Sequence, residues 1–277
     1  MFRQSSRIVK ATTAVRFPGF LRTSLRLLTL SVACAGLLAG IVSGDEPKTL
    51  PVIPNSDAEA LQKSLSDQLL ILNVRVSQRA PAVALFSQRG DVHFFMGNFS
   101  RAVADYQKMV EIDPQQEASH WRLGLALYYH QQYKEAAAQF DRCYSLDQID
   151  RENGIWRYFA QFRALGKETA RKQLLKYTKN DREPFGDLYQ LFSGELSARQ
   201  IFDRIQSARI SEIDREQRLF YAHLYVGLDN VLEGDRETAK EELKLAVESS
   251  WPRQAGYGPN YMWHVARLQL RLLQTSP

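Results

Sequence analysis

Apolar residues recur at helical intervals along the chain from residue 56 onwards. The first such run places four leucines on one face of a single helix, at Leu61, Leu65, Leu69 and Leu72. The next two runs are "GDVHFFMGNFSRAVADYQKMVEIDP", starting at Gly90, and "GLALYYHQQYKEAAAQFDRCYSLDQ", starting at Gly124. They repeat one pattern at an interval of 34 residues, which predicts two consecutive units of similar structure over residues 83–116 and 117–150.

Each of these two units has the pattern of two helices joined by a short turn. The polar pairs Gly97-Asn98 and Gln131-Gln132 interrupt the apolar periodicity midway through each unit. Small and aromatic residues correspond between the units: Gly90 with Gly124, Ala102 with Ala136, and Tyr106 with Phe140. We expect the small residues to make room for the backbone of the partner helix, and the aromatic rings to fill the adjoining space.

The same pattern returns near the C-terminus in "LYVGLDNVLEGDRETAKEELKLAVE", residues 224–248. Two degenerate units, at 156–177 and 187–205, are expected in between, with Gly166 and Gly194 at their turns. A Gly- and Pro-rich loop at 249–260 then precedes a terminal helix over 261–273. The predicted fold is all-α, a solenoid of about five helical hairpins, some degenerate, with a lead-in helix and a C-terminal capping helix.

The 34-residue period and the order of small and large residues resemble the tetratricopeptide repeat. The order of elements over residues 56–273 resembles the NlpI family of bacterial envelope lipoproteins, most specifically in the "GD…A…L.LAV" block at 234–247, with a weaker likeness in "EPF" at 183–185. This resemblance implies a non-enzymatic adaptor that dimerises and brings a periplasmic protease together with cell-wall hydrolases. The chain departs from the family at Cys34, where the lipidation signal is poor.

The formal net charge of +5 comes from the N-terminal segment. Six of the 36 basic residues lie within the first 44 residues, which contain no acid; they are Arg3, Arg7, Lys10, Arg16, Arg22 and Arg26. The remaining chain has 30 basic and 31 acidic residues, a net charge of −1. Because nucleic-acid-binding proteins present a positively charged surface, we expect no nucleic acid among the partners.

An uncharged apolar stretch, "LLTLSVACAGLLAGIV" at residues 27–42, follows these basic residues. The pattern is typical of an export signal or a membrane anchor. A cleaved signal peptide, an uncleaved anchor and a lipid anchor at Cys34 each agree with it, and each places the body outside the cytoplasm; an Arg-rich mitochondrial transit peptide is a fourth alternative. The predicted organisation is a signal peptide or membrane anchor at 1–44, a proline-rich linker at 45–55, and a helical repeat domain at 56–277.

In stacked helix pairs of this type, the first helices of the units line a concave face. The residues predicted to line it are largely aromatic: Phe94, Phe95, Trp121, Leu125, Tyr128, Tyr129 and Trp156. Such a groove is suited to an extended or helical peptide segment, and the alternative is that these side chains pack between repeats. Ser87 and Asp91 stand where some repeats carry the Lys and Asn that clamp a terminal carboxylate, so no carboxylate clamp is expected.

The sequence contains no phosphate loop, zinc motif or other pattern that indicates catalysis, a metal or a cofactor. The predicted function is a non-enzymatic adaptor, anchored to or exported into the bacterial cell envelope, that binds other proteins or peptide segments. The N-terminal segment would contact the membrane, and a homodimer is left open. The alternative is a structural assembly subunit of a membrane or secretion complex.

Overall fold

A computed structural model describes residues 55–275, and the regular secondary structure in this part of the chain is entirely helical. In chain order the elements are α1 (Asn55–Gln78), α2 (Val83–Phe95), α3 (Phe99–Ile112), the 3-10 helix η1 (Pro114–Ser119), α4 (Trp121–Tyr129), α5 (Tyr133–Leu146), α6 (Arg151–Leu165), α7 (Lys167–Lys172), α8 (Phe185–Ser193), α9 (Ala198–Ser207), α10 (Glu212–Glu233), α11 (Arg236–Glu248), the 3-10 helix η2 (Trp251–Arg253) and α12 (Tyr257–Thr275). The predicted signal or anchor at 1–44, Cys34 within it, and the linker up to residue 54 lie outside the described residues.

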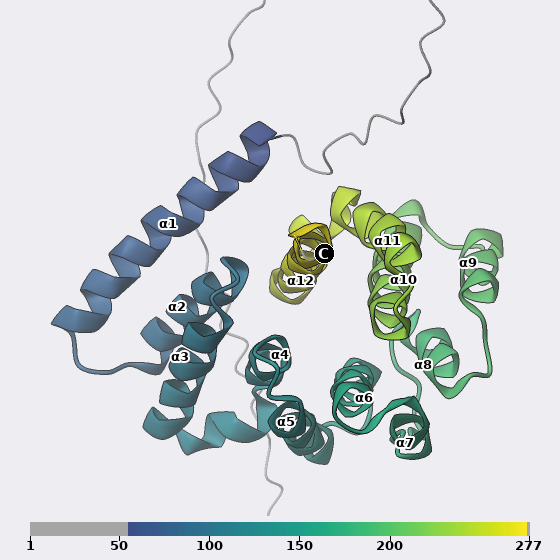
Figure 1. Ribbon diagram of the computed structural model, residues 1–277, viewed down its shortest axis with the longest axis horizontal. Coiled ribbons are helices and arrows are strands. Elements are labelled where there is room, and N and C mark those ends of the chain that lie inside the picture. The colour runs from purple at the N-terminus through teal and green to yellow at the C-terminus, as the bar shows by residue number, and fades with distance from the viewer. Residues whose placement is uncertain (1–54, 276–277) are drawn as a thin grey trace, which may run out of the picture. The chain divides into compact units, whose positions relative to one another are not determined.

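Consecutive helices pack as hairpins, α2 with α3, α4 with α5, and α10 with α11 (Figure 1). The turns between them contain residues in the left-handed region: Gly97 at φ 83°, Gln131 at φ 62° and Gly234 at φ 85°. The polar breaks in the sequence therefore mark the turns correctly. The hairpins predicted for 83–116, 117–150 and 224–248 are confirmed, although α10 begins earlier than the last of these ranges.

The repeated glycines are explained by side chains of the following helix. A Cβ atom built on Gly90 would lie 2.5 Å from Cε1 of Tyr106, and one on Gly124 would lie 2.6 Å from Cζ of Phe140. In α10 the corresponding Gly227 accommodates Leu243, at 2.8 Å from its Cγ. At Gly90 and Gly124 the expectation that the small residue makes room for backbone is thus corrected, because the nearest atoms belong to a ring; at Gly227 the backbone nitrogen of Leu243 is also close, at 3.2 Å.

The third unit departs from the predicted pattern. Gly166 forms the expected turn at φ 85°, but α7 ends at Lys172, so the helix predicted to continue to residue 177 is wrong there. The backbone carbonyls beyond α7 accept hydrogen bonds from side chains instead. Arg157 Nη1 donates to Gln173 O (2.6 Å), Tyr189 OH to Leu175 O (2.8 Å) and Tyr144 OH to Lys176 O (3.0 Å). These bonds replace the intrahelical ones that a longer α7 would make.

The fourth unit follows the prediction for 187–205 closely. Gly194, at φ 87°, ends α8 in the left-handed conformation. Ser197 then begins α9 with a capping box, in which its hydroxyl accepts from the amide of Gln200 and the Gln200 side chain accepts from the Ser197 amide. The degenerate middle of the sequence is therefore helical, with one short second helix.

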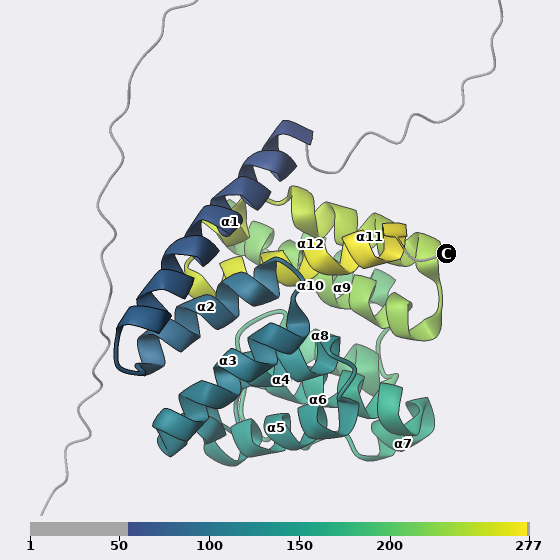
Figure 2. The ribbon, with the colours of Figure 1, turned by 60° about the vertical axis from the view of Figure 1, so that its left-hand side comes forward.

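The first and last helices both contact the first repeat (Figures 1 and 2). Helix α1 is amphipathic as predicted and buries Leu65 and Leu72 against Val92 of α2. Helix α12 starts four residues before the predicted position and covers α11, as a capping helix would. It also reaches back to the first hairpin, where the hydroxyls of Tyr261 and Tyr106 lie 3.1 Å apart.

Candidate functional site

A cavity of about 370 Å³ lies between the first helices of the repeats and the start of α12. Its walls come from α4, α5, α6, α10, η2, α12 and the loop before α8. The aromatic lining consists of Trp121, Phe140, Trp156, Tyr221 and Trp251, and the polar lining of Asp150, Glu152, Asn153, Arg182 and Gln217. A concave site of this volume, with aromatic walls and a set of polar groups, is of the kind that binds ligands.

The aromatic walls are held by contacts behind them. Trp156 is only 2% exposed, and its Nε1 donates to the hydroxyl of Tyr225 at 3.1 Å. The ring centroids of Trp251 and Tyr221 lie 5.8 Å apart in an edge-to-face arrangement, and those of Trp121 and Tyr261 lie 4.9 Å apart. The rings are therefore fixed in place before any ligand arrives.

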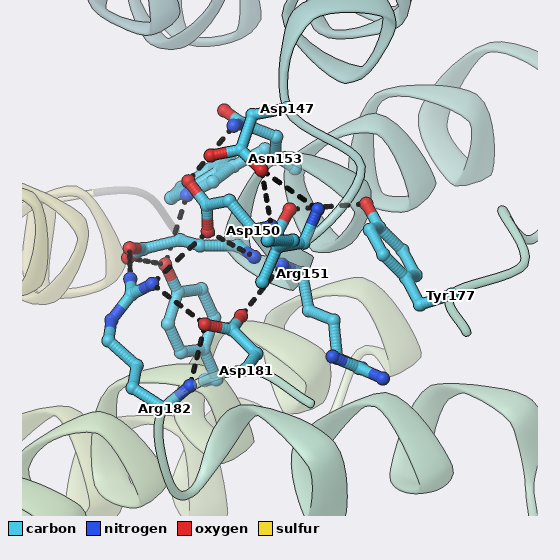
Figure 3. Close-up of polar contacts among 11 residues, drawn as sticks. Asp147, Asp150, Arg151, Asn153, Tyr177, Asp181 and Arg182 are labelled. Carbon is cyan, nitrogen blue, oxygen red and sulfur yellow. Dashed lines mark hydrogen bonds and ion pairs between the residues drawn. The ribbon is translucent and has the colours of Figure 1, made fainter. Parts of the chain in front are cut away.

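The charged wall of the cavity is built on the N-terminus of α6. Asp150 is the N-cap residue and accepts from the amide of Glu152 (3.0 Å) and from Asn153 Nδ2 (3.0 Å). Arg182 Nη1 lies 3.3 Å from both Asp150 Oδ1 and Asp181 Oδ1, and its Nη2 pairs with Glu152. Three carboxylates therefore share one guanidinium (Figure 3).

Burial controls the protonation of this wall. The pKa of Glu152 is raised to about 7, because desolvation outweighs the attraction of Arg182. Burial also raises the pKa of Asp150 above its ordinary value, with a smaller contribution from the negative charge of Asp181. Glu152 accepts a further hydrogen bond from the Tyr225 hydroxyl. Carboxyl groups with raised pKa values beside a cavity are typical of functional sites.

The sequence model of the family described as "Tetratricopeptide repeat" matches residues 84–116, which contain α2, α3 and the start of η1. The same hairpin, with a small residue facing a large one, recurs in α4–α5 and in α10–α11. Residues 84–116 therefore form a tetratricopeptide repeat, and the hairpins α4–α5 and α10–α11 resemble it. Such repeats bind other proteins, and their stacked helices provide the binding surface.

Two of the seven predicted groove residues, Trp121 and Trp156, line the cavity between the tetratricopeptide repeats and α12. The other five lie between helices. Phe95 stacks on His264 of α12 with ring centroids 3.8 Å apart, and Phe94 packs against Tyr261 at 4.9 Å. Helix α12 thus occupies the inner side of the first repeat.

Leu125, Tyr128 and Tyr129 pack inside the second repeat and against its neighbours. Leu125 is fully buried, and the rings of Tyr128 and Tyr129 surround Trp156 at 5.4 and 6.3 Å. For these residues and for Phe94 and Phe95, contact with a partner stays a prediction. Their positions show that each also has a packing role.

The two positions considered for a carboxylate clamp bind a cation from the next repeat. Arg122 Nη1 donates to Ser87 Oγ at 2.9 Å and to Asp91 Oδ1 at 2.8 Å. Asp91 also accepts from the hydroxyls of Tyr106 and Tyr257, each at 2.7 Å. These side chains join the tetratricopeptide repeats to α12.

Sequence reasoning missed the cavity residues of the second half of the chain, Arg182, Tyr221 and Trp251. The sequence contained two weak indications of a polar and aromatic site in this region. Glu152 stands near the start of an otherwise aromatic helix, and a tryptophan stands in the Gly- and Pro-rich loop. Among the described residues, no group of three or more His, Cys, Asp and Glu side chains could hold a metal, and no helix is long and apolar enough to cross a membrane.

Proposed function

We propose that the protein is a non-enzymatic adaptor that binds a segment of a partner protein in the cavity between its tetratricopeptide repeats and α12. The observation that carries this proposal is the preformed cavity of about 370 Å³ with three tryptophans in its walls. Tryptophan rings dominate the energy of many protein interfaces, because they bury a large area with little loss of conformational entropy. The cavity opens where helices of three hairpins, α4–α5, α6–α7 and α10–α11, meet α12.

The adaptor acts in the bacterial cell envelope under this proposal. The support is the basic, acid-free leader followed by the uncharged stretch at 27–42, together with the resemblance to the NlpI family. That resemblance suggests envelope proteases or cell-wall hydrolases as partners. Mass spectrometry of the mature N-terminus tests the location: an end at Asp45, an acylated Cys34 or a retained Met1 agrees with a cleaved signal, a lipid anchor or an uncleaved anchor, respectively.

Two glycines provide a matched test of the cavity. Gly258 and Gly186 are each the second residue of a helix, in α12 and α8, and a Cβ atom at either position meets no atom within 4 Å. Only Gly258 lines the cavity. We expect Gly258→Leu to abolish co-purification of partner proteins from detergent-solubilised membranes, and Gly186→Leu to leave it unchanged.

The same comparison separates the adaptor from a structural assembly subunit. Partners that are lost on Gly258→Leu and are present in variable amounts support the adaptor. A stoichiometric complex that survives Gly258→Leu contradicts the role of the cavity and supports the scaffold instead. Circular dichroism of both variants checks that the helices are intact.

A further inference from the structure

The charged wall of the cavity, together with the adjoining Asp181, has more acidic than basic side chains. Asp150, Glu152 and Asp181 contact a single guanidinium, that of Arg182. The neighbouring Arg151 does not add a second cation at this point. Its side chain runs away from the guanidinium of Arg182 (Figure 3) and lies over the ring of Tyr177, 5.1 Å from the centroid. With every carboxylate ionised, the group has a net charge of −2.

The same contacts make the wall a poor site for an anion. Both terminal nitrogens of Arg182 already donate to carboxylates, and its guanidinium covers the ring of Phe185 at 4.0 Å. An incoming carboxylate or phosphate would have to displace these partners and approach three acidic groups. Electrostatic complementarity therefore favours a positively charged ligand.

The aromatic walls favour a cation on an apolar stem. Trp121, Trp156 and Trp251 line the cavity beside the carboxyl groups. Tryptophan faces attract cations, and methylene groups of lysine and arginine pack on apolar surface while their charged ends reach polar groups. Burial of Asp150 and Glu152 raises their pKa values, so both would gain from a nearby positive charge.

We infer that the cavity receives a lysine or arginine side chain of the bound partner segment, with its stem between the tryptophans and its charge at Asp150 and Glu152. This inference rests on the proposed function, because it specifies the ligand of the same cavity. It predicts the chemistry of the recognised segment: a basic residue at one fixed position, with no requirement for a free C-terminus.

The experiment selects ligands from a bead-displayed library of random heptapeptides. The probe is the full-length chain, which is purified in detergent and carries a fluorescent label. Beads that bind the wild type are sorted a second time with Gly258→Leu and Gly186→Leu. We expect a set of peptides that binds the wild type and Gly186→Leu but not Gly258→Leu, with Lys or Arg enriched at one position. The fluorescence of the three cavity tryptophans gives the affinity of each selected peptide.

The outcomes separate the inference from the proposed function. Peptides that depend on an open cavity but show no preference for Lys or Arg overturn the inference alone. A selection without any peptide sensitive to Gly258→Leu overturns the proposed function and the inference with it. Enrichment of Lys but not Arg, or the reverse, supports the inference and identifies the cation.

Two peptides of the same shape that differ in charge test the contact. Replacing the selected Lys by norleucine, which keeps the stem and removes the charge, should weaken binding about tenfold or more. Glu152→Gln should weaken the Lys peptide by a similar factor and leave the norleucine peptide nearly unchanged. Glu168→Gln, on the exposed side of α7, is the control and should change neither. Equal effects of Glu152→Gln on both peptides contradict a direct charge contact.

Discussion

Gly90, Gly124 and Gly227 each stand sixteen residues before the side chain that fills the space above them. This constant separation leads from the middle of one helix, through the turn, to the middle of the next, so the pairing fixes how the second helix packs on the first. The rings of Tyr106 and Phe140 are fully buried. At these positions the choice of glycine is thus dictated by packing.

Gly124→Ala should destabilise the protein by about 1–3 kcal/mol, although alanine is the better helix former. The reason is the buried ring of Phe140, which lies 2.6 Å from the new Cβ, so that the ring or the helix backbone has to shift. Thermal unfolding followed by circular dichroism measures the change. The control is Gly186→Ala in α8, where the added methyl meets no atom within 4 Å and stability should be unchanged or higher. Equal stability of the two variants would contradict the packing argument.

Glu152 lines the cavity, and burial shifts the pKa of its carboxyl group. Its side chain is 16% exposed, and the pKa of its carboxyl is raised from 4.5 to about 7. The folded chain therefore binds a proton here that the unfolded chain has released between these pH values. The charged and titratable groups that face Glu152 are Asp150, Asp181, Arg182, Tyr221 and Tyr225.

Because the folded state holds the extra proton, the contribution of Glu152 to stability decreases as the pH rises from about 4.5 to 7. Glu152→Gln removes this titration. We expect the stability of the wild type to fall by about 1–3 kcal/mol more than that of the variant over this window. Urea unfolding at several pH values measures both, and the variant corrects for other buried acids such as Asp229. Parallel pH profiles would show that Glu152 titrates normally.

At the scale of elements, the sequence predicted the helices wherever the repeat was regular. Helices α2 to α5 and α10 to α11 have the Gly–large pairing, and their turns contain the polar breaks. Helix α7 could not be predicted at its correct length, because Arg157, Tyr144 and Tyr189 lie on three other helices and take the carbonyls beyond it. No local pattern reports such long-range hydrogen bonds.

The return of α12 to the first repeat was also absent from the sequence prediction. Three helices meet at Arg122, which comes from α4 and donates to Asp91 of α2 and to the hydroxyl of Tyr257 in α12. The side chains of Arg122 and Asp91 are 16% and 13% exposed, so their charges are largely desolvated. The hydrogen bond between Arg122 and Tyr257 joins residues that are 135 positions apart in the chain. Helical periodicity does not indicate contacts over such a sequence separation.

Asp91→Asn should destabilise the protein by about 1–3 kcal/mol, because Arg122 is left in a mostly buried site without its counter-charge. Urea unfolding followed by circular dichroism measures the loss. Arg122→Met in the Asp91→Asn background should restore part of the stability, since it removes the uncompensated cation. Additive losses in the double variant would mean that the two residues are not coupled.

At the scale of the whole described region, the cavity joins residues from Trp121 to Met262. Trp121 and Trp156 were predicted as ligand-binding residues because repeat register alone places them on the inner side. Tyr221, Trp251 and Arg182 were not predicted, since they reach the cavity from α10, from η2 and from the loop before α8. Their placement depends on how the degenerate hairpins turn, which the sequence pattern leaves undetermined.

Helix α1 has an exposed apolar face. It packs on α2 with one side and exposes Leu70 (67%), Ile71 (51%) and Val74 (45%) on another. A cluster of exposed apolar side chains on one helix is typical of an interaction surface. The sequence left a homodimer open, and this face would be its interface, with α1 of each copy in contact.

Ile71→Glu should convert such a dimer to a monomer, because it places a charge at the centre of this apolar face. Light scattering of the purified full-length chain, corrected for bound detergent, measures the mass of both forms. Gln62→Glu is the matched control, since it adds one acid at an exposed position of the same helix, on a different side from the apolar cluster. A dimeric mass for Ile71→Glu, or a monomeric mass for the wild type, would exclude α1 as the dimer interface. Loss of the dimer in Ile71→Glu but not in the control would support α1 as the interface.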